Sequence, residues 1–244
     1  MQTHAKASGT DDGSLTVFTL CFVGGCMDCV SYLLLFHVLL GVMTVNTMIG
    51  IIGIVDRKDV HDAMLHLSTV LGFLIMVFAH NLIVAVRKKP VEAKPALSCL
   101  TLELAIVLVY TVLASQLLRH GQLREPNLVV FALVCLGSFT VYLQNSVVPS
   151  GRGLPASTMV MTGNYVSLLT HSVSMLMQSD GKRDARQAVK YFLLVHIHFW
   201  GGVAVMAWLA PSFDFLALIL PCLALGVLIL KLKGSRRQAV DMGA

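Results

Sequence analysis

Long runs of apolar residues with almost no charge fill most of this sequence, and they restrict the fold more than any other feature. Charged residues make up only 13% of the chain and gather in short clusters between these runs. A soluble domain carries about a quarter charged residues, whereas about 20 apolar residues match the thickness of a bilayer core. The sequence therefore predicts an all-α integral membrane protein, a polytopic helix bundle in the lipid bilayer.

Eight apolar segments can be traced, and six to eight of them are expected to cross the membrane. The second is short and rich in glycine, and only the region of Ala210 and Pro211 separates the last two. Either pair could therefore form a re-entrant or tight hairpin. The membrane domain is expected over residues 15–233, between a polar tail (1–14) and a basic tail (234–244). The segments run over 15–37, 40–55, 66–86, 96–118, 127–149, 155–177, 188–210 and 212–232.

The net charge of +5 does not indicate a nucleic-acid-binding protein. The lysines and arginines lie in short loops beside the apolar segments, where they bias membrane topology, and no aromatic-rich basic surface accompanies them. If all eight segments span, most of the 18 basic residues fall on the side that holds both termini. Both termini are then expected to be cytoplasmic, although the cluster at 87–89 lies on the other side.

The two halves of the chain resemble each other, which suggests a repeat of residues 15–118 in residues 127–232. Each half opens with a helix that carries small residues and then a polar group. Each continues with a segment containing threonine and asparagine, at 44–50 and at 157–164, and then with a helix that bears histidines. Internal duplication is common in transporters, whose sites often lie between the repeats.

A polar stripe follows the sixth segment. On one helix over 157–178, the residues Ser157, Asn164, His171 and Gln178 recur every seven positions along about 32 Å, a full membrane crossing. Lipid cannot satisfy these groups, so the stripe is expected to face other helices or water. Two interpretations stay open: hydrogen bonding that only holds helices together, or the lining of a path for a solute or ion.

Asp28 and Glu103 are the acidic residues expected deep in the membrane. An isolated carboxylate at mid-span is costly, so Asp28 should have a partner or be protonated. Glu103 could be a paired buried carboxylate, or it could lie near the membrane interface.

The sequence offers no positive sign of an enzyme, a cofactor or a metal site, since no nucleotide-binding, hydrolase or zinc-protease motif occurs. His196 and His198 point about 200° apart on a helix, so one helix cannot present both to one ion. The six cysteines lie within apolar runs, which argues against a disulfide framework.

Two stretches carry a family resemblance. "FVGGCMDCVSYL" followed by "MTVN", and "LQNSVV" followed by "GRGLPASTMVMTGN", resemble the motifs of the YoaK-like family, membrane proteins with a domain of unknown function. The resemblance implies a multi-helix membrane protein with a suspected transport role and no established substrate. The sequence departs from the family pattern after Asn46 and at the histidines of the third and seventh segments. The matching positions are Gly24, Gly25, Asp28, Ser31, Thr44, Asn46, Gln144, Asn145, Gly153, Leu154, Pro155, Ser157, Thr158, Thr162 and Gly163.

These observations lead to two main hypotheses. The chain is a small-solute transporter or channel whose polar path runs between the two halves, or it is a non-transporting membrane scaffold, which could form homo-oligomers. An intramembrane enzyme is a third reading without a suggested reaction. The expected path-lining residues are Asp28, Asn46, Gln144, Asn145, Thr158, Thr162, Asn164 and His171, with Gly24, Gly25, Gly153, Pro155 and Gly163 as small or turn residues. Neutral or cationic solutes are expected, with Asp28 or His171 as proton-coupling groups.

Overall fold

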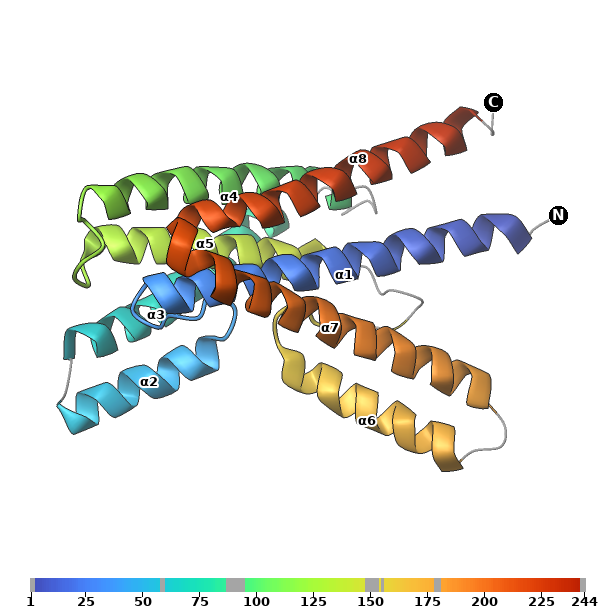
Figure 1. Cartoon of the computed structure of the whole chain (residues 1–244), viewed down its shortest axis with the longest axis horizontal. Helices are drawn as coiled ribbons and strands as arrows, with labels where there is room; N and C mark the ends of the chain where they lie inside the picture. The colour runs from blue at the N-terminus through green and yellow to red at the C-terminus, as the bar shows by residue number, and fades with distance from the viewer. Residues whose placement is uncertain are drawn as a thin grey trace.

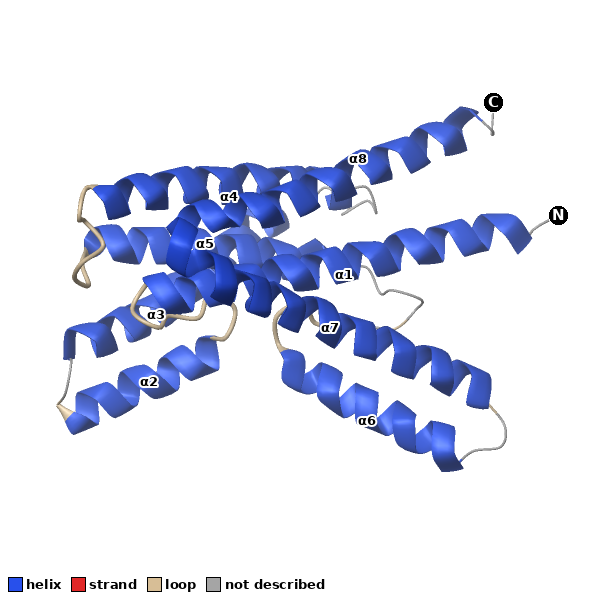
Figure 2. Cartoon of the chain, in the orientation of Figure 1, coloured by secondary structure: helices blue, strands red, loops and turns tan. Residues whose placement is uncertain are grey.

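The computed structural model describes residues 3–57, 60–86, 95–147, 154, 156–177 and 181–241, and these fold as an all-helical bundle (Figure 2). The described residues form eight α-helices and one 3-10 helix. They are α1 (Thr3–Leu34), α2 (Met43–Asp56), α3 (Val60–Val86), α4 (Pro95–Arg119), α5 (Leu128–Val147), α6 (Met161–Met177), α7 (Lys182–Phe213), η1 (Asp214–Leu218) and α8 (Ile219–Asp241).

The helices form a central bundle with two arms (Figure 1). Helices α1, α4, α5 and α8 run along the long axis of the molecule, and both termini lie at the same end. Helices α2 and α3 form an arm at the lower left of this view, and α6 and α7 form an arm at the lower right. Within the bundle and arms, α1 packs most extensively against α7, and each arm is a pair of packed helices.

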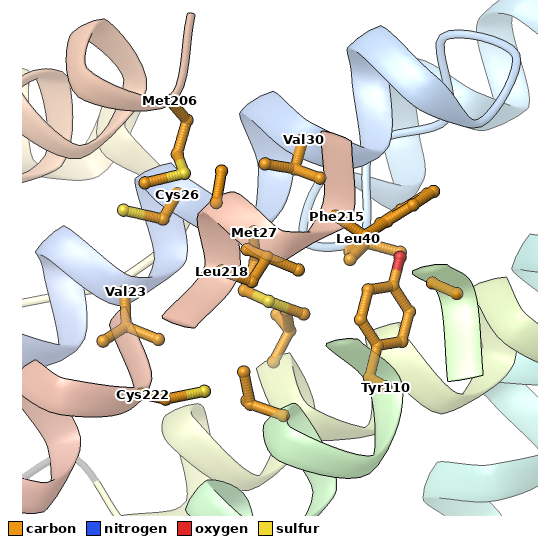
Figure 3. Close-up of a cluster of buried hydrophobic side chains, with 14 of the residues drawn as sticks. Val23, Cys26, Met27, Val30, Leu40, Tyr110, Met206, Phe215, Leu218 and Cys222 are labelled. Carbon is orange, nitrogen blue, oxygen red and sulfur yellow. The ribbon is translucent and has the colours of Figure 1, made fainter. Parts of the chain in front are cut away.

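The main core lies where η1 and the ends of α1 and α7 meet α4 (Figure 3). Met27, Tyr110, Met206, Phe215 and Leu218 are almost fully buried there. The Tyr110 and Phe215 rings make an edge contact with centroids 6.1 Å apart. Because η1 is apolar and short, it closes the core between the two long helices and reverses the chain direction from α7 to α8.

The outer surface is apolar, as expected of a chain in contact with lipid. Side chains such as Phe78, Leu176 and Trp208 are largely exposed. A helix with apolar residues all round is typical of a membrane span. Four helical stretches in the described part of the chain are long and apolar enough to cross a bilayer, and the chain is an integral membrane protein. They are 13–34, 60–83, 97–119 and 182–235, and the last includes α7, η1 and α8.

Several helix boundaries have clear local causes. The Asn127 side chain caps α5, because its Oδ1 accepts hydrogen bonds from the main-chain N–H groups of Val129 and Val130. Gly121 ends α4 with a φ of 69°, and its N–H donates to the carbonyl of Leu118. The left-handed conformation at this position favours glycine.

Two expected helix boundaries differ from the structure. The helix expected over 155–177 begins only at Met161, because the Ser157 hydroxyl accepts hydrogen bonds from the N–H groups of Met159 and Val160 and holds this segment in a turn. The break expected near Ala210 and Pro211 lies after Phe213 instead, since α7 includes Pro211. For the two tails the sequence predicts no secondary structure; their described parts are helical, with α1 beginning at Thr3 and α8 continuing to Asp241.

Candidate functional site

Two breaks in the helical chain form the centre of the candidate site. The first lies between α1 and α2, over residues 35–42. Asn46, the fourth residue of α2, closes this loop: its Nδ2 donates to the Leu39 carbonyl at 2.6 Å, and its Oδ1 accepts from the Leu39 N–H at 3.1 Å. The Oδ1 also lies 3.2 Å from Nδ1 of His66 on α3. Asn46 is fully buried. It therefore satisfies main-chain groups that lipid cannot.

The second break, over residues 156–160 before α6, is closed in the same way. Asn164 is the fourth residue of α6; its Nδ2 donates to the Ser157 carbonyl at 2.7 Å, and its Oδ1 accepts from the Ser157 N–H at 3.1 Å. In both loops the partner lies seven residues before the asparagine. Each asparagine also contacts the sulfur of the methionine three residues earlier, Met43 or Met161.

Asp28 fastens the first loop to α1. Its Oδ1 accepts a hydrogen bond from the Gly41 N–H at 3.0 Å, and the N–H of Leu40 contributes a second. The side chain is only 4% exposed. No lysine or arginine in the described part of the chain pairs with it. Main-chain N–H groups therefore supply its hydrogen bonds, and none of the described residues gives its charge a cationic partner.

The two loops meet at Met159. A Cβ atom added at Gly24 or at Gly41 would overlap the Met159 side chain. The Cβ atom added at Gly24 would also lie 3.0 Å from the Thr158 carbonyl oxygen and 3.4 Å from Oε1 of Gln144. Glycine at these positions therefore allows the second loop to lie directly on α1 and on the first loop.

A cavity of about 410 Å³ opens beside this junction. Asp28 lies in its wall, together with residues of both loops and of the first turn of α6. Aromatic rings complete the wall, from α1 (Tyr32), α6 (Tyr165) and α7 (Phe199 and Trp200). The Trp200 Nε1 donates to the Tyr165 hydroxyl at 2.9 Å, which links α7 to α6 across the cavity wall. The cavity thus combines a buried carboxylate with aromatic rings.

The family model "Protein of unknown function (DUF1275)" matches residues 16–230. The chain belongs to the DUF1275 family. The resemblance to the YoaK-like family is confirmed by this match, which covers almost the whole membrane domain. No curated protein and no solved structure matches the chain.

In this DUF1275 chain, the buried side chains of Glu103 and Gln144 join α4 to α5. Gln144 Nε2 donates to Oε1 of Glu103 at 2.6 Å, and both side chains are fully buried. Oε1 of Gln144 and Oε2 of Glu103 have no hydrogen-bond partner among the described residues, and neither does the hydroxyl of Thr158. Of the two readings of Glu103, the structure gives the paired buried carboxylate.

Replacing Gln144 with leucine is expected to lower the free energy of unfolding by about 1–3 kcal/mol, because it leaves the buried Glu103 carboxyl without its donor. Gln116 on α4 is exposed, and Gln116→Leu serves as the matched control with an effect within about 0.5 kcal/mol. Thermal melting of the detergent-purified protein measures both. Equal melting temperatures for the two variants would show that the pair contributes nothing.

The structure brings most of the predicted site residues together but not all. Asp28 and Thr162 line the cavity, and Thr158 and Gln144 lie just behind it at Gly24. His171 lies apart: it stacks on Phe192 and lines a different cavity of about 480 Å³.

The expected polar stripe does not run along one helix. Ser157 lies in the loop, and Asn164 bonds back to it, while His171 sits two turns further along α6. Gly25 lies at the crossing of α1 and α7, and Gly163 has no neighbour within contact distance of an added Cβ. Gln178, Gly153, Pro155 and the side chain of Asn145 lie outside the described residues.

The sequence contains a signal that the expected alignment of the halves missed. The hydrogen bonds align Met43-Thr44-Val45-Asn46 with Met161-Thr162-Gly163-Asn164, whereas the expectation compared 44–50 with 157–164. No sequence signal separates the cavity residues Tyr32, Tyr165 and Trp200 from other aromatic residues of the membrane domain.

Proposed function

We propose that this chain is a small-solute membrane transporter or channel whose polar path lies between two helical halves. The observation that carries the proposal is the pair of helix breaks that meet beside a cavity containing Asp28. Irregular backbone at membrane depth is tolerated where it is buried in protein or lines a water-filled cavity, and broken helices form the substrate sites of many transporters.

We also propose that the halves 15–118 and 127–232 are duplicated units. Three features support this. Both α2 and α6 start with Met-Thr-x-Asn and make the same hydrogen bonds. The packing is equivalent when α1–α4 are exchanged for α5–α8: α1 packs on α7 and α8, as α5 packs on α3 and α4. The two arms also extend from the bundle to opposite sides (Figure 1).

The orientation with both termini in the cytoplasm is part of the proposal. The basic residues that flank the spans favour it. The position of both termini at one end of the molecule is compatible with it (Figure 1).

A scaffold without transport is the second candidate, and one observation favours it. Asn46, Asn164 and Gln144 direct their hydrogen bonds to groups of the same chain, as expected of side chains that only hold helices together. On this view the protein acts through protein contacts, and homo-oligomers or a fixed partner protein would be its working form.

Reconstitution into proteoliposomes separates the two candidates. A panel of amino acids, sugars, nucleobases, polyamines and inorganic ions is tested for flux by uptake or by membrane currents. We expect flux of at least one solute with the wild type, and a loss of at least tenfold with Asp28→Asn or Thr162→Val. The matched controls Asp62→Asn and Thr101→Val lie away from the cavity and should retain flux. If none of the solutes shows flux and the protein forms a stable oligomer, the scaffold is favoured.

A further inference from the structure

We propose that the cavity beside Asp28 binds a small organic cation of the alkylammonium type, with the Asp28 carboxylate as its counter-charge and the aromatic wall as its second contact. This proposal rests on the proposed function, because it names the class of solute for the same cavity.

The first step concerns charge. Asp28 is almost fully buried, and its partners are the N–H groups of Gly41 and Leu40. Main-chain N–H groups donate to the carboxylate, but an ionised carboxylate in an apolar site also needs a nearby opposite charge. Among the residues that the structure describes, no lysine or arginine lines the cavity. A cationic ligand in this cavity would supply the opposite charge that the described lining residues lack.

The second step concerns the aromatic rings. Tyr32, Tyr165 and Trp200 line the same cavity as the carboxylate. The hydrogen bond from Trp200 to the Tyr165 hydroxyl and the edge contact of Phe199 with Trp200, at 5.4 Å between centroids, restrict the orientation of the indole. Ring faces attract ammonium groups, and aromatic cages are a common way to bind quaternary ammonium ligands.

The third step concerns size and the competing ligand class. A volume of about 410 Å³ is at the lower end of small-molecule sites, so it suits a compact amine rather than a large substrate. The first turn of α6 also lines the cavity, and a helix start favours anions. The Ser157 hydroxyl already accepts from the Met159 and Val160 N–H groups ahead of this turn, and Asp28 repels an anion.

The test uses three probes of the same shape and different charge. Choline is cationic, 3,3-dimethyl-1-butanol is its neutral analogue, and 3,3-dimethylbutanoate is anionic. Binding to the full chain in detergent is measured by calorimetry and by thermal shift. We expect choline alone to bind, Asp28→Asn to abolish binding, and Trp200→Leu to weaken it roughly tenfold. Trp208 is exposed on α7 and does not line the cavity, so Trp208→Leu is the matched control and should bind choline like the wild type.

The source of the ammonium group is decided by a second arm. The protein is placed in nanodiscs of phosphatidylglycerol alone or with phosphatidylethanolamine. If choline does not bind but phosphatidylethanolamine stabilises the wild type and not Asp28→Asn, the cation is a lipid headgroup and the proposal holds. Equal binding of all three probes, a preference for the anion, or choline binding that survives Asp28→Asn overturns it.

These outcomes remain distinct from failure of the proposed function. Binding of choline that depends on Asp28, without flux of any solute, would refute transport and leave the cation site intact. Flux of a neutral or anionic solute, without choline binding and without stabilisation by phosphatidylethanolamine, would refute the cation site and leave transport intact. If Asp28→Asn does not fold, weaker choline binding by Trp200→Leu than by Trp208→Leu still supports the proposal, and equal binding by the two variants overturns it.

Discussion

Replacing Gly202 with alanine is expected to destabilise the protein by about 1–3 kcal/mol, whereas the same change at the adjacent Gly201 is expected to be neutral or stabilising by up to about 1 kcal/mol. The reason is the crossing of α1 and α7. A Cβ atom at Gly202 would overlap the main-chain carbonyl oxygen of Phe22, and one at Gly25 would overlap that of Phe199. Main-chain atoms within packed helices cannot move aside as a flexible side chain can.

Gly201 is a close control, because it lies on the same helix and an added Cβ meets nothing within 4 Å. Thermal melting in detergent compares the two variants directly, and Gly25→Ala should behave like Gly202→Ala. If Gly201→Ala and Gly202→Ala destabilise the protein equally, the close approach of α1 and α7 does not depend on the glycine at 202. Small residues that allow close helix approach are frequent in membrane proteins.

The all-helical membrane bundle could be predicted from the sequence because burial in lipid leaves a strong compositional trace. A run of about 20 apolar residues has few alternatives to a membrane helix. The helices α3, α4 and α7 accordingly overlap the expected segments 66–86, 96–118 and 188–210 closely. Helix ends were harder to predict. The start of α6 depends on the Ser157 hydroxyl and on Asn164, and such local hydrogen bonds compete with the helix without changing the apolar pattern.

The candidate site could be predicted only in part. Asp28 and Thr162 are polar residues in apolar segments, and this contrast makes them visible. Met159 and Gly41 owe their importance to the contact between two loops that are far apart in the sequence. Such a contact follows from how the helices pack, which hydropathy does not encode. The expected stripe fails for a related reason: the chain before Met161 is not helical, so Ser157 does not share a helix with Asn164 and His171.

Asn164→Leu and Asn46→Leu are each expected to cost about 2–5 kcal/mol. Each substitution leaves the partly buried main-chain N–H and C=O of Leu39 or Ser157 without their partners, and each unsatisfied group costs about 1–3 kcal/mol. The exposed Asn127 provides the comparison, because it caps α5 and its replacement by alanine should cost only about 1 kcal/mol. Melting temperatures in detergent, with monodispersity checked by size-exclusion chromatography, give the order of the three variants.

The size of the two effects also bears on the duplication of the halves. If the two asparagines perform the same task, Asn46→Leu and Asn164→Leu should destabilise the protein by similar amounts, because each removes the donor and the acceptor that pair with position 39 or 157. The prediction fails if Asn164→Leu is as mild as Asn127→Ala. A large cost at one asparagine alone would mean that only one loop depends on its side chain, and the proposed equivalence of the loops would then be wrong.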